Sequence, residues 1–372
     1  MVFAARPTRC LAVDPMHPNA AVIREAGNVL RRGGLVAFPT ETVYGLGANA
    51  LDARAVADIF YAKGRPVDNP LIVHIDRAES LRDYVAEIPP VVPQLAARFW
   101  PGPLTLVIRG GEKFAPGVTG GLGTVAVRVP AHPVALAIIR AAGAPVAAPS
   151  ANASGRPSPT TAAHVLDDLA GRVDLVVDGG PAGLGVESTV LDLTGERPVI
   201  LRPGGVTRQE LEPVLGPVEL DKSVLGEAAG GRPRSPGMKY THYAPRAPLF
   251  LFEGGDGSQL AKRILEEAER LAAAGHKVGV LACEETAALY RGKGYHLVVV
   301  GRRSDPGTVA ASLYESLRRF DRLGVDVILA EGIPCDGVGL AVMNRLRRAA
   351  GGNIVAVCTD DSPDPGISIY KP

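Results

Sequence analysis

Two short strings of the chain combine cationic side chains with neutral hydrogen-bonding side chains. The first is Lys63-Gly64-Arg65-Pro66, and the second, about ninety residues later, is Ser150-Ala151-Asn152. Lysine and arginine neutralise phosphate charge, whereas a hydroxyl and an amide fix the orientation of phosphate oxygens. This inventory suits a polyphosphate, and a nucleotide-handling enzyme is therefore the leading hypothesis.

Each string also has a purely structural explanation. Lys63 and Arg65 stand at the end of a predicted helix, where cations compensate the helix dipole whatever the function. Ser150 and Asn152 belong to a loop rich in Ser and Asn, which is common in any protein. The turn Asp68-Asn69-Pro70 follows the first string at once, so its cations sit on a tight turn, which favours the functional interpretation.

The stretch from Pro39 to Gly47 follows a predicted buried strand and begins with Thr40, Glu41 and Thr42. Hydroxyls and a carboxylate at the end of a strand can bind a small polar ligand. Turn formation and capping explain the same residues equally well. Tyr44, next to glycines, suggests an aromatic wall beside closely approaching backbone.

Arg128 stands between Val127 and Val129 in a predicted apolar strand. A guanidinium is costly to bury without a partner, so we expect an anion beside it. The partner is either an internal carboxylate or a ligand carboxylate held by two hydrogen bonds, and we favour the ligand. His74 lies in another predicted strand, where a lone histidine is usually a satisfied packing residue. Arg202, before a Pro-Gly-Gly turn, is a further cation at the end of a strand.

Length and composition bound the possible functions. The chain has 372 residues, which is too long for one ordinary core and predicts two domains. A hydrophobic fraction of 46% argues against global disorder, and a net charge of +1 provides no overall attraction to nucleic acid or membranes. The four cysteines form no C-x-x-C pair, so neither a zinc site nor a disulfide framework is expected. No apolar run could span a bilayer, and we expect a cytoplasmic protein.

The hydrophobic periodicity divides the chain into three regions. In residues 1–215 several predicted strands follow one another without a helix between them, which favours a mixed-sheet α+β domain. Residues 216–248 are polar and rich in Gly and Pro, as in a linker. In residues 249–372 strands and helices alternate regularly, which predicts a smaller three-layer α/β/α domain with a parallel sheet.

Taken together, these strings resemble the threonylcarbamoyl-AMP synthase family in its long two-domain form. The resemblance spans nearly the whole chain, and no single string would be specific without the others. It implies a twisted mixed-sheet YrdC-like α+β catalytic domain, a linker, and a smaller Rossmann-like α/β/α domain. The strings are Pro39 to Gly47, Lys63 to Pro66, Asn69 to His74, Ser150 to Asn152, and the linker string Ser235 to Pro245.

The resemblance also implies a reaction. L-Threonine, bicarbonate (or CO₂) and ATP give L-threonylcarbamoyladenylate and pyrophosphate. Mg²⁺ would be carried by the ATP phosphates rather than by a metal site of the protein. Other proteins would transfer the threonylcarbamoyl group to an adenosine of transfer RNA, and whether this chain binds transfer RNA itself stays open.

Positions of the family's motifs carry over residue by residue. The resemblance places the threonine site at Thr42, His74, Arg128, Ala148 and Ser188. It places the ATP site at Arg65, Asn69, Thr124, Ser150, Ser158 and Arg202, with His242 or Tyr243 reaching in from the linker. Lys63, Arg65, Ser150 and Asn152 match the family's catalytic polar tetrad.

Residues 232–246 are also expected to close over the nucleotide as a lid, because the product is easily hydrolysed. Their deletion should raise ATP turnover without accumulated product.

Two other functions compete with this one. An RNA-binding or ribosome-assembly module would use a basic concave surface, but the near-neutral charge and the lack of an aromatic and basic stripe count against it. A carbamoyltransferase of the hydrogenase-maturation type shares the catalytic domain. Such proteins carry Cys-rich zinc modules, which the scattered Cys10, Cys283, Cys335 and Cys358 do not supply.

Overall fold

The computed structural model describes residues 7–224, 234 and 242–357. Contacts within the chain divide it into two compact units, Met1–Tyr240 and Thr241–Pro372. Most of the predicted linker, residues 225–233 and 235–241, lies outside the described residues, and so does most of the expected lid. None of the described helices is long and apolar enough to cross a membrane.

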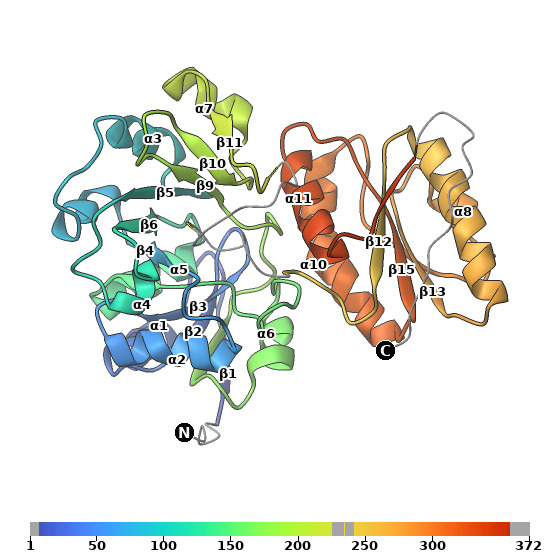
Figure 1. Ribbon diagram of the computed structural model, residues 1–372. Helices are drawn as coiled ribbons and strands as arrows, with labels where there is room; N and C mark the ends of the chain where they lie inside the picture. The colour runs from blue at the N-terminus through green and yellow to red at the C-terminus, as the bar shows by residue number, and fades with distance from the viewer. Residues whose placement is uncertain (1–6, 225–233, 235–241, 358–372) are drawn as a thin grey trace. The chain divides into compact units, whose positions relative to one another are not determined.

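A large mixed sheet forms the centre of the N-terminal unit (Figure 1). Its described strands lie in the order β1-β8-β2-β3-β7-β4-β6-β5-β9-β10-β11. Parallel and antiparallel neighbours alternate irregularly, because some consecutive strands are joined by loops and others by helices. The strands are β1 (Arg9–Ala12), β2 (Val36–Pro39), β3 (Tyr44–Asn49), β4 (Ile72–His74), β5 (Leu104–Arg109), β6 (Thr124–Arg128), β7 (Val146–Ala147), β8 (Leu175–Asp178), β9 (Thr189–Asp192), β10 (Val199–Arg202) and β11 (Glu219–Leu220).

The helices of this unit begin and end at residues that the sequence supplies for that purpose. Asn19 and Asp52 cap the first two helices by accepting hydrogen bonds from backbone N–H groups of the first turn. Gly64 ends the second helix in the left-handed conformation, with φ of 62°, which glycine adopts without strain. The helices are α1 (Ala20–Arg31), α2 (Ala53–Lys63), the 3₁₀ helix η1 (Ala78–Asp83), α3 (Val92–Phe99), α4 (Pro116–Thr119), α5 (Pro133–Ala142), α6 (Ala162–Leu169) and α7 (Arg208–Leu215).

Three strands in the middle of this sheet, β4, β6 and β7, end at or just before polar residues. β4 runs parallel to β6, and His74 is the register partner of Arg128. β7 runs antiparallel to β4, and the chain continues from it through Ala148 to Ser150. All five side chains of β4 and β7 are buried, so the strand ends have fixed positions.

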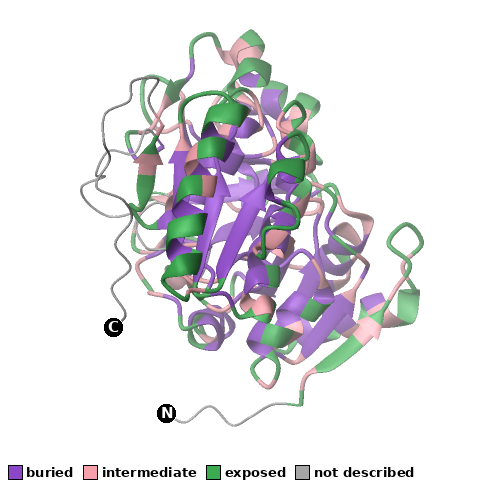
Figure 2. Ribbon diagram, turned by 90° about the vertical axis from the view of Figure 1, so that its right-hand side faces the viewer, coloured by how far each residue is buried: buried purple, intermediate pink, exposed green. Residues whose placement is uncertain are grey.

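The C-terminal unit contains a five-stranded sheet in the order β14-β13-β15-β12-β16, and every described pair is parallel. Helices cover both faces of this sheet, with α8 on one face and α10 and α11 on the other (Figure 1). Its central strands are buried beneath partly exposed helices (Figure 2). The elements are β12 (Leu249–Glu253), α8 (Gly257–Ala273), β13 (Val278–Ala282), α9 (Ala287–Tyr290), β14 (His296–Val299), α10 (Pro306–Leu323), β15 (Val327–Glu331), α11 (Gly339–Ala350) and β16 (Ile354–Ala356).

The predicted fold class is confirmed: a mixed-sheet unit precedes a parallel α/β/α unit. The segment Tyr44–Asn49 is a strand, because its backbone pairs with β2 and β7 although glycines interrupt its sequence pattern. Asp256 rather than Ser258 caps α8, since its carboxylate and the side chain of Gln259 form a reciprocal capping box.

Candidate active site

Lys63, Ser150 and Asn152 form one contiguous cluster. The ammonium group of Lys63 lies 2.5 Å from the carbonyl oxygens of both Ser150 and Asn152. The hydroxyl of Ser150 donates to Oδ1 of Asn152 at 2.6 Å. Because Lys63 is the last residue of α2, the end of a helix and a loop eighty-seven residues away in sequence are fixed together.

Arg65 lies two residues further along the chain and is 8% exposed. Its Nη2 donates to the carbonyl oxygen of Pro70 at 3.0 Å and to that of Asn69 at 3.3 Å. Oδ1 of Asn69 is buried, and among the described residues it has no hydrogen-bond partner. The turn from Arg65 to Pro70 thus holds a guanidinium and an amide oxygen at the start of β4.

A second set of contacts fixes the loop that follows Ser150. Asp168 of α6 accepts a hydrogen bond from the backbone N–H of Ala153 and pairs with Arg156 at 2.9 Å. Ser158, fully buried, donates to the carboxylate of Glu187 at 2.5 Å. The loop from Ser150 to Ser158 is therefore anchored by carboxylates at both of its ends.

Arg128 lies at the end of β6 and is 3% exposed. Its Nε donates to the carbonyl oxygen of Gly102, and its Nη1 donates to Oγ1 of Thr42, both at 3.1 Å. Its Nη2 is 2.5 Å from Oε1 of Glu41, so the structure supplies the internal carboxylate that was one of the two expected partners. Among the described residues, however, neither this Nη2 nor either oxygen of Glu41 makes a hydrogen bond.

His74 stands beside Arg128 on the neighbouring strand. Burial, and then the positive charge of Arg128, lower the pKa of His74 to about 3, so its imidazole is neutral at physiological pH. Its Nδ1 forms no hydrogen bond with any residue that the structure describes. The buried, neutral ring thus keeps one nitrogen without a partner among the described residues.

Ser188 and Arg202 extend the same part of the sheet across β5, β9 and β10. The guanidinium of Arg202 donates to the carbonyl oxygen of Ser188 at 3.0 Å and to its hydroxyl oxygen at 3.2 Å. The Ser188 hydroxyl also shares a hydrogen bond of 2.8 Å with Thr105 of β5. These contacts connect the residues predicted for threonine with one predicted for ATP.

Ala148 and Thr124 both lie toward the end of the central strands at which β4 begins. The N–H of Ala148 donates to the carbonyl oxygen of Ile72, which places Ala148 beside β4. Thr124 begins β6 and Arg128 ends it, so the two residues are separated by the length of that strand. The structure therefore brings Thr42, His74 and Arg128 together and leaves Thr124 at the opposite end of β6.

His242 and Tyr243 belong to the C-terminal unit. Tyr243 has a φ of 66°, and its ring lies 5.3 Å from the ring of Tyr314 in α10 and 5.6 Å from the guanidinium of Arg345 in α11. Each distance is measured to a ring centroid. These contacts explain why Tyr243 is buried, and the expectation that one of the two residues reaches ATP stays a prediction.

Three acidic residues of this region were missing from the sequence-based site. Glu41 was recognised as a carboxylate at the end of a strand but was given no role. Asp168 and Glu187 were not singled out at all, although Glu187 directly precedes Ser188. The signal that could have found Asp168 is weak, since it lies in a helix far along the chain from the loop that it holds.

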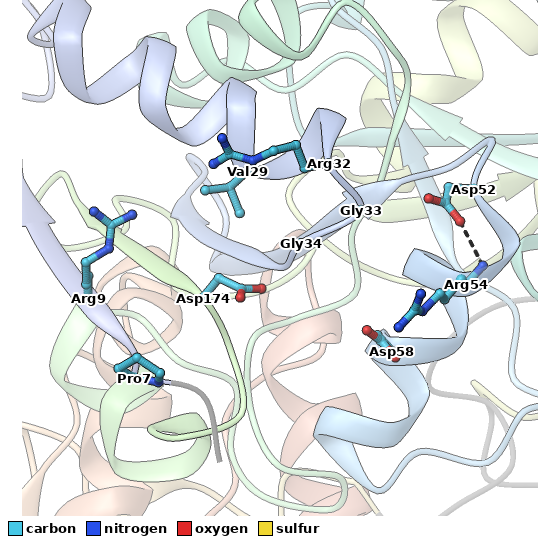
Figure 3. Close-up of a pocket in the computed structure, with 10 residues that line it drawn as sticks. All are labelled: Pro7, Arg9, Val29, Arg32, Gly33, Gly34, Asp52, Arg54, Asp58 and Asp174. Atoms are coloured by element: carbon cyan, nitrogen blue, oxygen red, sulfur yellow. Dashed lines mark hydrogen bonds between the residues drawn. The ribbon is translucent and has the colours of Figure 1, made fainter. Parts of the chain in front are cut away.

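The N-terminal unit also has a pocket of about 520 Å³ away from these residues (Figure 3). Three arginines and three aspartates line it together with two glycines, so its formal charges balance. Asp52 caps α2 there, and Asp174 accepts a hydrogen bond from the backbone of Leu35. Such a pocket lacks the excess of cations that a polyphosphate needs.

Family models match both parts of the chain. A family model described as "Telomere recombination" and named for Sua5, YciO and YrdC matches residues 28–204. A second model, described as the C-terminal domain of threonylcarbamoyl-AMP synthase, matches residues 206–351. Together the two models account for both units of the chain.

Full-length relatives carry the same family name. A threonylcarbamoyl-AMP synthase of Bacillus subtilis is 51% identical over 92% of this chain and 96% of its own length. One of Pyrococcus abyssi is 49% identical over 90% of this chain and 96% of its own. The crystal structure of P. abyssi Sua5 complexed with L-threonine has a TM-score of 0.88, with 46% identity over 94% of this chain and 99% of that one. This chain belongs to the threonylcarbamoyl-AMP synthase family, as its motifs predicted.

Proposed function

We propose that this protein makes L-threonylcarbamoyladenylate and pyrophosphate from L-threonine, bicarbonate (or CO₂) and ATP. The names of its relatives and the threonine complex of the P. abyssi protein support this activity. The observation that carries it is the arrangement around β4. The Arg65–Asn69 turn precedes this strand, and the His74–Arg128–Thr42 cluster follows it. A three-residue strand is about 10 Å long, which suits an amino acid beside a triphosphate.

The threonine half of the site consists of Thr42, His74, Arg128, Ala148 and Ser188 in this proposal. Arg128 supplies a fork of donors for the threonine carboxylate. The unfilled Nδ1 of His74 can bond to the threonine side chain, as acceptor or donor according to the tautomer of the neutral ring. The backbone beside Ala148 forms a wall of the site.

The nucleotide half contains Lys63 and Arg65, whose side chains are held by hydrogen bonds to backbone carbonyl oxygens. We assign ATP to Arg65, Asn69, Thr124, Ser150, Ser158 and Arg202, and we assign catalysis to Lys63, Arg65, Ser150 and Asn152. His242 or Tyr243 belongs to the ATP site on the resemblance alone. Thr124 begins β6, which runs parallel to β4, and its position on the side of the Arg65–Asn69 turn supports its assignment to ATP rather than to threonine.

No covalent enzyme intermediate is needed for this reaction. The threonine amine attacks bicarbonate or CO₂, and an oxygen of the resulting carbamate attacks the α-phosphate of ATP while pyrophosphate leaves. The protein contributes positioning and neutralisation of charge at Lys63 and Arg65. Loss of one such charge-assisted contact typically costs a few kcal/mol, roughly a hundredfold in rate.

Mg²⁺ enters this proposal as a companion of ATP. Across the described ranges, no three His, Cys, Asp or Glu side chains gather closely enough to hold a metal ion. Mg²⁺ binds phosphate oxygens and waters with few protein ligands, so a metal carried by the triphosphate fits this set of donors. The buried Oδ1 of Asn69 is an oxygen available on the nucleotide side. When bound, the metal would neutralise charge on the phosphates.

The product is a mixed anhydride, so it must pass quickly to the enzymes that modify transfer RNA. We include those downstream transfer proteins as partners. A cytoplasmic location is part of the same proposal, because transfer RNA is the final acceptor.

Pyrophosphate release tests the proposed function directly. The protein is incubated with ATP, bicarbonate and each of several amino acids, and release should require threonine and bicarbonate together. Arg65→Ala and Ser150→Ala should each reduce it about a hundredfold, whereas Glu25→Gln, in an exposed pair with Arg9, should leave it unchanged. Release without threonine, or wild-type rates in both site variants, would refute the assignment.

A further inference from the structure

Glu41 is an acidic side chain that pairs with Arg128, one of the residues assigned to threonine. It follows Thr40 at the end of β2, and its side chain is 20% exposed. The backbone N–H of Leu184 donates to its carbonyl oxygen at 2.8 Å, which fixes the main chain and leaves the carboxylate to face Arg128. Nothing in the turn itself uses that carboxylate, because the hydroxyls of Thr40 and Thr42 make the local hydrogen bonds.

Glu41 and Arg128 form a close ion pair that lacks an aligned hydrogen bond. Nη2 of Arg128 is 2.5 Å from Oε1 of Glu41, yet within the described residues neither atom forms a hydrogen bond of acceptable geometry. Oε2 of Glu41 is also buried without a partner there. Buried polar atoms are almost always hydrogen-bonded, so a cluster of unfilled ones marks a place where a ligand supplies the missing partners.

The unfilled atoms match the charged groups of an α-amino acid. Nη2 of Arg128 offers donors to a carboxylate, and the two oxygens of Glu41 offer acceptors to an ammonium. In an amino acid both groups are bonded to the same carbon, so a contiguous cation and anion in the protein can bind them together. The adjacent Nδ1 of His74 is left for the threonine side chain.

We propose that Glu41 receives the α-ammonium of threonine and accepts the proton that this group must lose before the amine can react. This inference rests on the proposed function and adds to it a base and a determinant of selectivity for amino acids.

The proton balance is simple. The ammonium gives one proton to the Glu41 carboxylate and becomes an amine with a free electron pair. That pair forms the N–C bond with bicarbonate, and hydroxide leaves with a second amine proton as water. The carbamate formed carries one negative charge, as bicarbonate did, and Glu41 is left neutral.

The surroundings of Glu41 suit this role. Arg128 of β6 and His132, at the start of α5, are the charged or titratable groups facing it in the described structure. Burial lowers the pKa of His132, and the charge of Glu41 opposes that shift. The segment 179–186, whose backbone closes over Glu41, contains no titratable side chain.

Binding of two ligands separates this role from a structural one. L-Threonine and 2,3-dihydroxybutanoate of matching configuration differ only in the group at the α-carbon, an ammonium in one and a hydroxyl in the other. Isothermal titration would measure both dissociation constants for wild type, Glu41→Gln and Glu253→Gln, the last being a matched control in another Arg–Glu pair.

We expect Glu41→Gln to weaken threonine binding about 10- to 100-fold, the size of a charge-assisted contact, and to change the affinity for dihydroxybutanoate less than threefold. If Glu41 only orients Arg128, both ligands lose affinity equally, because both carry the carboxylate that Arg128 would bind. Equal losses, or no loss, overturn the inference. Failure of the wild type to bind threonine would instead overturn the proposed function.

The role of Glu41 as a base is tested by the pH dependence of pyrophosphate release. In Glu41→Gln the proton must leave to solvent, so pyrophosphate release at saturating threonine should fall about a hundredfold at pH 7 and rise about tenfold per pH unit toward pH 9. The control Glu253→Gln should keep the wild-type rate and profile. A pH profile for Glu41→Gln that is parallel to that of the wild type would contradict the assignment.

Discussion

Two pairs of arginine and glutamate, one in each unit, use the same chemical groups in opposite ways. Arg347 of α11 binds Glu253 of β12 through two parallel hydrogen bonds of 2.7 and 2.8 Å. Arg128 approaches Glu41 within 2.5 Å, but the facing atoms are not aligned for hydrogen bonding. The carboxylates are equally covered, at 19% and 20% exposure, whereas Arg128 is far more buried than Arg347.

The difference in hydrogen bonding between the two pairs indicates which of them can bind a ligand. A bidentate pair at the end of a strand uses the donors and acceptors that face each other and joins that strand to a helix. The Glu41–Arg128 pair leaves three buried polar atoms without a hydrogen bond among the described residues, so these atoms can bond to a ligand. Charge and residue type alone do not distinguish the two pairs, so the comparison depends on geometry.

The largest effect that would test this comparison comes from removing one partner of the buried pair. Arg128→Met leaves Glu41 without its cation, and we expect the free energy of unfolding to fall by about 3–5 kcal/mol. Urea unfolding can be followed through Trp100, because it is the single tryptophan of the chain and its unit also contains Arg128.

The double variant Arg128→Met/Glu41→Gln should recover at least half of that loss, since no unpaired charge remains. A loss of less than 1 kcal/mol in the single variant would mean that the two pairs are energetically alike and would remove the basis of the comparison.

Acid should destabilise the N-terminal unit through His74, which lies beside Arg128 of the buried pair. The unfolded chain binds a proton on His74 below its ordinary pKa of 6.5, whereas the folded protein does so only near pH 3. The free energy of unfolding is therefore unaffected above about pH 6.5. It should fall by about 1.4 kcal/mol per pH unit as the pH decreases below that value.

His74→Gln removes this titration and should flatten the slope measured by Trp100 fluorescence between pH 6 and 4. The difference between wild type and variant isolates His74 from His132, whose lowered pKa acts in the same direction. An identical slope in both proteins would show that the ring is protonated in the folded state.

The smallest effect belongs to the pair in the C-terminal unit. Arg347→Met should destabilise α11 and β12 by about 1 kcal/mol, because Glu253 is partly solvated and remains hydrated without its partner. Hydrogen exchange of the amides in these two elements would measure the change. Threonine-dependent pyrophosphate release should stay at the wild-type rate, and a tenfold loss would show that this pair also takes part in catalysis.

Local signals made most elements predictable from the sequence. Asn19 and Asp52 cap helices where an Asx residue precedes an apolar periodicity, and Gly64 ends α2 in the left-handed conformation. The strand Tyr44–Asn49 escaped prediction, because glycine weakens the strand pattern and its pairing partners are supplied by other parts of the chain. At the start of α8, Asp256 and Ser258 are both residues that can cap a helix, and the structure uses Asp256.

The candidate site was predictable as residue types, and less so as geometry. The pairing of Lys63 with the Ser150 loop was suggested by their chemistry and is present as direct contacts. The position of Thr124, away from Arg128, follows from strand direction, which the motif comparison does not contain. Asp168 and Glu187 act on the loop across long sequence separations, so only the folded chain reveals them.

The sequence by itself determined the family, the two kinds of sheet and the inventory of polar side chains, because motifs, periodicity and caps are encoded over a few neighbouring residues. Only the tertiary structure decided that Glu41 is the carboxylate next to Arg128 and that their hydrogen bonds are unfilled. Those facts depend on where β2, β4 and β6 lie relative to one another in the same sheet. The distance and alignment of two buried charges are set by that packing and by no short segment of the chain.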